Sequence, residues 1–353
     1  MSILFAILLF SRLIFVHELG HFLTAKASGV QVNEFALFMG PAIFKKQVGE
    51  TLYSIRCIPF GGYCAMEGED DDSDNPRSFG KASWWKRIII LAAGAFMNLV
   101  AGALLITIVY APAEQFVVPV IDYVEPSSAL GEGNGLQAGD RILKVDGENI
   151  YVQSDFEMIL TINGGETHDF LVERNGEKVE LTGVSTQRRE FANEDGTTTL
   201  RYGITFTLVE ASFGETAGYI WNTCVDTVRT VRLSLQMLFT GRAGFQDLTG
   251  PVGLVQQIST VADQSPNAYA ATMNMLYMGG FIAINLAVMN LLPIPALDGG
   301  RIVGVLLTTA VEAVTKKKIN PKYEAYLHGI GMILLLGLMA VILFKDIFVI
   351  FKG

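Results

Sequence analysis

The chain has 353 residues, of which 50% are hydrophobic and only 17% are charged, and its mean hydropathy is +0.38. A soluble globular enzyme carries about 25% charged residues, so the composition excludes that class and favours a membrane region plus at least one further folded unit. The net charge is −9, and no long basic block lies outside the expected loops, which argues against nucleic acid as a partner. Three cysteines, an odd number without paired CxxC spacing, indicate neither a disulfide framework nor a cysteine-based zinc site and favour free thiols.

Four apolar segments predict membrane-spanning helices. A helix that crosses the ~30 Å hydrocarbon core of a bilayer needs roughly 20 mostly apolar residues. Three runs of this length contain no Asp, Glu, Lys or Arg, and they cover residues 88–111, 264–297 and 325–344. Residues 2–26 open like the core of a signal peptide, but they run into His17, Glu18 and His21 instead of a cleavage site. We therefore expect this segment to be retained as the first span.

The first span carries the strongest chemical signal in the chain, His17-Glu18-Leu19-Gly20-His21, which fits H-E-x-x-H. On a helix the two histidines project from one face and can bind one Zn²⁺, while Glu18 can take a proton from water as the general base. Since the chain has only four histidines, the expected number of chance matches is on the order of 10⁻³. Three costly polar groups inside one span indicate function.

Catalytic zinc usually has three protein ligands, so a further ligand is needed at the same depth. Asp298 and His328 are the two candidates. Asp298 follows two prolines and precedes a glycine pair, which should interrupt the helix where the backbone lines a watery cavity. His328 stands by itself at the start of the last span, where a histidine usually packs at an interface. Asp298 is the favoured third ligand.

The distribution of Lys and Arg predicts the orientation in the membrane. Basic residues gather between spans one and two and between spans three and four, at positions 26, 45, 46, 77, 81, 86 and 87 and at positions 316–318 and 322. Both loops should therefore face the cytoplasm, which leaves both termini and residues 113–263 outside. The first and third spans then run inward, and both reach their candidate ligands near the cytoplasmic side.

The external stretch predicts a compact β-rich domain. β-branched or alternating runs cover residues 116–124, 140–150, 168–184 and 201–209, and turn signals such as Asp146-Gly147 and Asn175-Gly176 separate them. Residues 154–161 favour a short helix between the second and third runs. This stretch is long enough to support its own core.

Two further segments favour supporting structure over chemistry. Residues 216–239 place apolar side chains at helical spacing, which predicts an amphipathic helix that packs on the domain or lies in the membrane interface. Residues 67–74 (EGEDDDSD) are acidic, and because they lack an EF-hand pattern a solvated loop is favoured over a cation site.

HELGH in a first span and NLLPIPALDGG in a late span together resemble the site-2 protease family of intramembrane zinc metalloproteases, and more specifically the regulator of sigma E protease group. Residues 94–98 (GAFMN) and 249–253 (TGPVG) also match that group, so the resemblance covers nearly the whole chain. It implies a bacterial plasma-membrane, multi-pass enzyme with a Zn²⁺ cofactor. Such enzymes hydrolyse a peptide bond within a transmembrane segment, and their single-span substrates, such as anti-sigma factors or signal-peptide remnants, are usually first trimmed by another protease.

The resemblance assigns roles by position. His17, His21 and Asp298 would bind zinc and Glu18 would be the general base, while Asn285 and Asn290 match positions that hold the unwound substrate. For these two asparagines, helix-to-helix hydrogen bonding remains an equal alternative. Residues 34–44 and 51–63 resemble a membrane-associated β element that could pair with an extended substrate by edge addition, or could simply seal the site.

The external domain resembles a single PDZ module in the permuted arrangement of these proteases. Residues 138–142 (AGDRI) form its most recognisable turn, and Tyr202, Gly203 and Ile204 are a possible remnant of its ligand-binding loop. Its groove would either bind a peptide or exclude bulky substrates, and exclusion is the favoured role. The expected organisation is a first membrane region at residues 1–112, the PDZ domain at 113–210, an amphipathic linker region at 211–262 and a second membrane region at 263–353.

Two other classes of protein are weaker alternatives. A membrane-bound PDZ adaptor or chaperone would need a closed structural zinc site with four protein ligands, for which only His328 is left as the fourth. A metal transporter would need ionisable groups distributed through the span, whereas those of this chain cluster near one face. Glu18 beside the ligands favours the enzyme.

Overall fold

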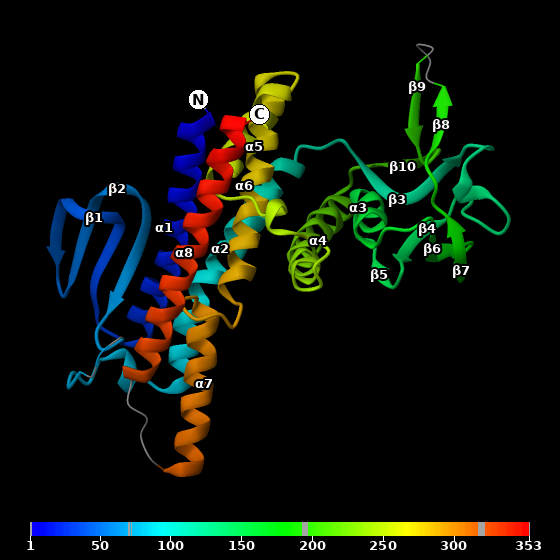
Figure 1. Ribbon diagram of the computed structural model, residues 1–353. Helices are drawn as coiled ribbons and strands as arrows, with labels where there is room; N and C mark the ends of the chain where they lie inside the picture. The colour runs from blue at the N-terminus through cyan, green and yellow to red at the C-terminus, as the bar shows by residue number, and fades with distance from the viewer. Residues whose placement is uncertain (1, 70, 72, 193–196, 317–321, 353) are drawn as a thin grey trace. The chain divides into compact units, whose positions relative to one another are not determined.

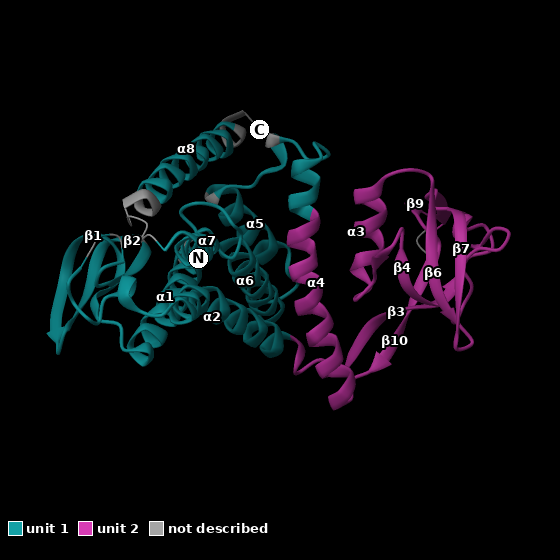
Figure 2. Cartoon of the chain, turned by 90° about the horizontal axis from the view of Figure 1, so that it is seen from below, with its two compact units in different colours: residues 1–109, 234–353 teal, residues 110–233 magenta. Residues whose placement is uncertain are grey.

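The computed structural model describes residues 2–69, 71, 73–192, 197–316 and 322–352. The chain forms two compact units, and each is described by itself: residues 1–109 with 234–353 form unit 1, and residues 110–233 form unit 2 (Figure 2). The predicted linker region is divided between them, because the helix α4 (Phe213–Phe239) begins in unit 2 and ends in unit 1.

Unit 1 is a bundle of helices with one two-stranded sheet (Figure 1). Its helices are α1 (Ser2–Ser28), α2 (Trp84–Tyr110), α5 (Pro251–Gln264), α6 (Ala268–Asn290), α7 (Asp298–Thr315) and α8 (Lys322–Lys352). Within the described residues, four helices are long and apolar enough to cross a membrane, at Ile7–Ser28, Trp84–Tyr110, Ala268–Asn290 and Tyr326–Phe348. The predicted four spans are thus confirmed as candidate spans, and the chain is a membrane protein.

The helices of unit 1 approach one another where glycines remove the Cβ atom. A Cβ on Gly20 of α1 would lie 2.4 Å from the Ala93 carbonyl oxygen of α2, and a Cβ on Gly102 of α2 would lie 2.9 Å from the Gly280 carbonyl oxygen of α6. Small residues allow such close backbone contact between membrane helices, where packing drives association in place of the hydrophobic effect. These contacts fix α1 against α2, and α2 against α6.

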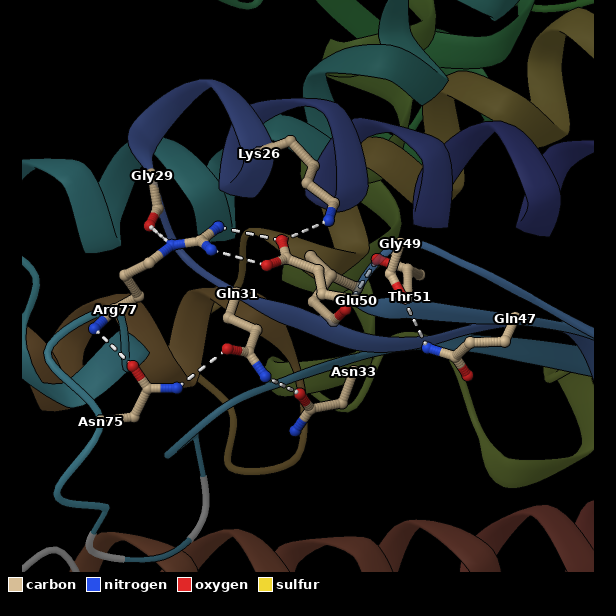
Figure 3. A network of polar contacts seen from close by, with 11 residues as sticks. Lys26, Gly29, Gln31, Asn33, Gln47, Gly49, Glu50, Thr51, Asn75 and Arg77 are labelled. Carbon is tan, nitrogen blue, oxygen red and sulfur yellow. Dashed lines mark hydrogen bonds and ion pairs between the residues drawn. The ribbon is translucent and has the colours of Figure 1, made fainter.

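The predicted β element is confirmed as an antiparallel pair, β1 (Val32–Val48) and β2 (Thr51–Met66). A network of polar contacts ties its turn to the end of α1 (Figure 3). Glu50 accepts from Lys26 at 2.6 Å and from both terminal nitrogens of Arg77 at 2.6 and 2.9 Å. The hydrogen bonds from Arg77 and Lys26 lower the pKa of the Glu50 carboxyl to about 2, so this carboxylate stays charged at physiological pH.

Unit 2 is built on one antiparallel sheet with the strand order β10-β3-β4-β6-β7, and β5 pairs with β4. The strands are β3 (Gln115–Val124), β4 (Arg141–Val145), β5 (Glu148–Asn149), β6 (Thr167–Arg174), β7 (Glu177–Ser185) and β10 (Ile204–Glu210). A second pair, β8 (Arg189–Ala192) with β9 (Thr198–Arg201), was not predicted. The short helix α3 (Ser154–Asn163) was predicted, and its Phe156 packs with Phe170 of β6 in a core that is almost fully buried.

A buried charge network joins α3 to α4 inside unit 2. Asp155 accepts hydrogen bonds from the backbone amides of Tyr151 and Val152 at 2.6 and 3.0 Å, and its other oxygen lies 2.8 Å from Arg229. Arg229 also pairs with Asp226, one turn earlier on α4. Two carboxylates thus share one guanidinium. Burial and the nearby charge of Asp155 raise the pKa of Asp226 to about 7.

This raised pKa predicts that unit 2 is more stable in mild acid than at alkaline pH. At pH values between the ordinary pKa of an aspartate and about 7, Asp226 is protonated in the folded protein and ionised in the unfolded chain. The free energy of unfolding should therefore rise as the pH falls through 7, by up to about 1.4 kcal/mol per pH unit. Thermal unfolding of wild type and Asp226→Asn from pH 5 to 8 tests this. The variant should lose this contribution to the pH dependence, and identical slopes in both proteins would contradict the assignment.

Candidate metal centre

Three side chains from two distant segments meet in unit 1. His17 and His21 lie one helical turn apart on α1, and Asp298 is the first residue of α7. The Nε2 atoms of the two histidines are 3.2 Å apart. Asp298 Oδ2 lies 3.2 Å from His17 Nε2 and 3.5 Å from His21 Nε2. Among the described residues these three side chains form the one group of His, Cys, Asp and Glu with metal-binding spacing.

The sequence around Asp298 folds locally to present this carboxylate. α6 ends at Asn290, the chain turns through Pro293 and Pro295, and α7 begins at Asp298, as the proline and glycine positions predicted. A Cβ on Gly299 would lie 2.3 Å from the Leu291 carbonyl oxygen, so only glycine lets the turn fold back over the start of α7. Asp298 is therefore held by backbone geometry.

The hydrogen bonds of His21 show which of its nitrogens is available. Its Nδ1 lies 2.8 Å from the Ile90 carbonyl oxygen of α2. A carbonyl can only accept, so Nδ1 carries the proton, and neutral His21 presents a bare lone pair at Nε2. That lone pair points to His17 Nε2 and Asp298 Oδ2.

The cluster fits a bound Zn²⁺ on observations of the protein itself. Asp298 Oδ2 is buried without a hydrogen-bond donor, and the nearby Nε2 of His21 offers it a lone pair instead of a proton. Converging electron pairs repel one another unless a cation lies between them. Two imidazoles and one carboxylate are a common donor set for catalytic zinc, which leaves a fourth position open.

Glu18 lies beside this cluster in a cavity of about 350 Å³. The lining includes His17, His21, Asp298 and residues 63–66 of β2. The backbone of Cys64 approaches the Glu18 carboxylate, and a Cβ on Gly62 would lie 3.5 Å from Glu18 Cγ. β2 therefore passes directly along the glutamate, and the open space lies between β2 and the start of α7.

Residues 5–338 match the description peptidase family M50. The chain belongs to this family. It is 38% identical over 351 residues to a candidate zinc metalloprotease of Clostridium perfringens, with 98% of each chain covered, and 33% identical to one of Fusobacterium nucleatum over the full length of both. It is 26% identical to the regulator of sigma-W protease RasP of Bacillus subtilis, with 97% of each chain covered.

Membership in family M50 confirms the predicted site-2 protease family, and with the donor set above it makes the chain a zinc metallopeptidase. The relatives are matched along nearly their whole length, so the resemblance is not confined to the HELGH motif.

The other predicted site residues are placed unequally. Asn290 lines the cavity, and its Nδ2 lies 3.5 Å from His17 Nδ1. Asn285 is half-buried on α6 and does not belong to the cavity lining. His328, the alternative ligand, accepts a hydrogen bond from the Ala296 amide at 3.0 Å and thereby holds the turn before Asp298. The structure brings Asp298, and not His328, to the two histidines.

In unit 2, Tyr202 and Gly203 lie between β9 and β10, and Ile204 is the first residue of β10. The carbonyl oxygen of Tyr202 accepts from the Ser128 hydroxyl at 2.6 Å, and that of Gly203 accepts from the Glu125 amide at 2.8 Å. Tyr202 and Ile204 pack against the core of the domain. Their proposed ligand-binding role stays a prediction.

Sequence reasoning missed Asn98 as a site residue, although it noted the GAFMN stretch. Asn98 is buried on α2, its Nδ2 lies 3.4 Å from His17 Nδ1, and its Oδ1 has no hydrogen-bond partner. With its amide flipped, Asn98 Oδ1 would accept a hydrogen bond from His17 Nδ1–H and gain the partner it lacks, because the hydrogen-bond network decides between the two amide orientations. This contact would orient His17 and leave its Nε2 free for metal. A lone asparagine in an apolar span was the available signal.

Proposed function

We propose that this chain is an intramembrane endopeptidase that hydrolyses a peptide bond within a transmembrane segment of a membrane protein. The observation that carries the proposal is the position of Glu18 and the His17–His21–Asp298 cluster in one cavity beside the free edge of a β-strand. His17, His21 and Asp298 hold zinc, and Glu18 is the general base. The chemistry that Zn²⁺ supplies when bound is Lewis acidity toward water and toward a peptide carbonyl.

Glu18 carries the proton transfers of the reaction. Its carboxylate lies in the cavity, so it accepts a proton from the attacking water and delivers it to the leaving amine. Asn98 beside His17, and the contact of His21 with the Ile90 carbonyl, keep the two imidazoles in the orientation that metal binding needs.

The substrate segment must lose its helical structure before hydrolysis, because a helical amide is shielded and hydrogen-bonded. β2 has β1 as its only strand partner in the described portion of the chain. Edge addition of an extended substrate to β2 would place its backbone next to Glu18. Asn290 lines the same cavity and can hold the unwound segment, and Asn285 is assigned this role by resemblance alone.

The arrangement in the membrane follows from charge. The basic residues of the segments between spans one and two and after α7 favour a cytoplasmic location for these segments and for the metal centre. Unit 2 is then extracytoplasmic. Its sheet and α3 support a single permuted PDZ module that excludes bulky domains, so that single-span proteins already trimmed by another protease, such as anti-sigma factors or signal-peptide remnants, are the substrates.

A cleavage assay with the purified protein in detergent tests the proposal. A single-span reporter without an external domain is incubated with the zinc-loaded protein, and the fragments are identified by mass spectrometry. We expect a cut within the span, loss of cleavage with a zinc chelator, and recovery when zinc is restored. Cleavage that survives complete zinc removal, or cuts confined to the soluble flanks of the reporter, would contradict it.

A further inference from the structure

The acidic stretch after β2 is not simply a solvated loop. Glu69 has only 14% of its side chain exposed, and it forms an ion pair with Nη1 of Arg301, 232 residues later in the chain. Its other oxygen accepts from the Met66 amide at 3.3 Å, at the end of β2. The carboxylate thus joins the end of one strand to a distant helix, which corrects the prediction for this residue.

Arg301 lies one turn after Asp298 on α7, so the two side chains share a face of the helix. Both line the cavity that contains Glu18. A guanidinium does not give up its proton in proteins and does not bind a metal cation. The proposed reaction therefore gives Arg301 no chemical role, and its position needs another explanation.

The ion pair connects the two sides of the space that a substrate would occupy. One side is β2, whose residues 63–66 line the cavity and whose Gly62 lies against the Glu18 side chain. The other side is the start of α7 with Asp298. An extended peptide added to the edge of β2 would lie between them. The length of the Glu69–Arg301 bridge therefore sets the distance between the substrate strand and the metal-binding aspartate.

We infer that Glu69 and Arg301 are a pair of positioning residues that hold β2 at a fixed distance from Asp298 and so align the scissile carbonyl of the substrate with the metal centre. This inference rests on the proposed function and deepens it. A misplacement of about 1 Å can lower a rate by about 10²-fold, so the pair acts on turnover although neither residue touches the reacting atoms.

A comparison of Arg301→Ala with Arg77→Ala tests the role of the arginine. Arg77 also pairs with a glutamate, Glu50, in unit 1, but neither residue lines the cavity. With the single-span reporter, we expect Arg301→Ala to lower kcat by about 10- to 100-fold and to keep one zinc per chain. Arg77→Ala should stay within about twofold of wild type in kcat. Equal activities of the two variants would overturn the inference, as would loss of zinc from Arg301→Ala.

A charge exchange distinguishes the ion pair from the single side chains. Glu69→Arg combined with Arg301→Glu restores the pair with opposite polarity, and it should recover at least about tenfold of the kcat that Arg301→Glu alone loses. Failure to recover, with zinc retained and the protein monodisperse, would overturn the inference. Wild type and Glu18→Gln are measured beside these variants. If wild type does not cleave, the proposed function fails; if it cleaves while Arg301→Ala is unimpaired, only the positioning role fails.

Discussion

Replacing Glu18 with glutamine should lower kcat for a single-span reporter by about 10²- to 10⁴-fold, the usual contribution of general acid–base catalysis. Glutamine has nearly the same shape and keeps one of the two side-chain oxygens. It cannot take a proton from water. The change therefore removes the proton acceptor and leaves the side-chain packing at the cavity in place.

Zinc content separates this result from a general loss of structure. Glu18 is not one of the three converging side chains, so Glu18→Gln should retain one zinc per chain. His21→Ala removes a member of the cluster and should lose both zinc and cleavage. Elemental analysis of purified proteins, run with the reporter assay, measures both quantities. Full cleavage by Glu18→Gln would remove the assignment of the general base.

The sequence could predict those features of the site that lie close together in the chain, or that follow from the depth of a residue in the membrane. His17, Glu18 and His21 are separated by helical spacing alone, and the interruption before Asp298 follows from its prolines and glycines. The strands of the larger sheet of unit 2 were predicted because alternating runs and turn residues are local signals. The helices α5 and α7 were missed. They lie directly before and directly after the apolar run at residues 264–297, which was interpreted as one membrane span.

The features that sequence could not predict depend on how helices rotate against one another. Asn98 meets His17 across 81 positions, and Glu69 meets Arg301 across 232. An acidic residue in a run of acidic residues is ordinarily solvated, so composition favoured the wrong interpretation for Glu69. Pairwise contact over such distances follows from tertiary packing, and no periodicity within one element reports it.

Replacing Gly94 with alanine should abolish zinc binding although the new side chain is a single methyl group. Gly94 lies inside α2, where a Cβ would be 2.3 Å from His21 Nε2 and 2.7 Å from His17 Cε1. Non-bonded contacts of a Cβ atom are essentially never this short, so at least one imidazole must leave its position. Alanine favours a helix by about 1 kcal/mol over glycine, which means that a loss of function cannot be attributed to a weakened α2.

Gly337→Ala is the matched control, because Gly337 also lies in a candidate span and its Cβ would meet nothing within 4 Å. We expect Gly337→Ala to keep one zinc per chain and wild-type cleavage, and Gly94→Ala to lose both while its helical circular dichroism and elution in detergent match wild type. The comparison tests the packing of α2 against the two histidines without altering any polar group. One zinc per chain and full turnover in Gly94→Ala would show that the imidazoles do not lie against α2, and the tautomer argument from Ile90 would fail with them.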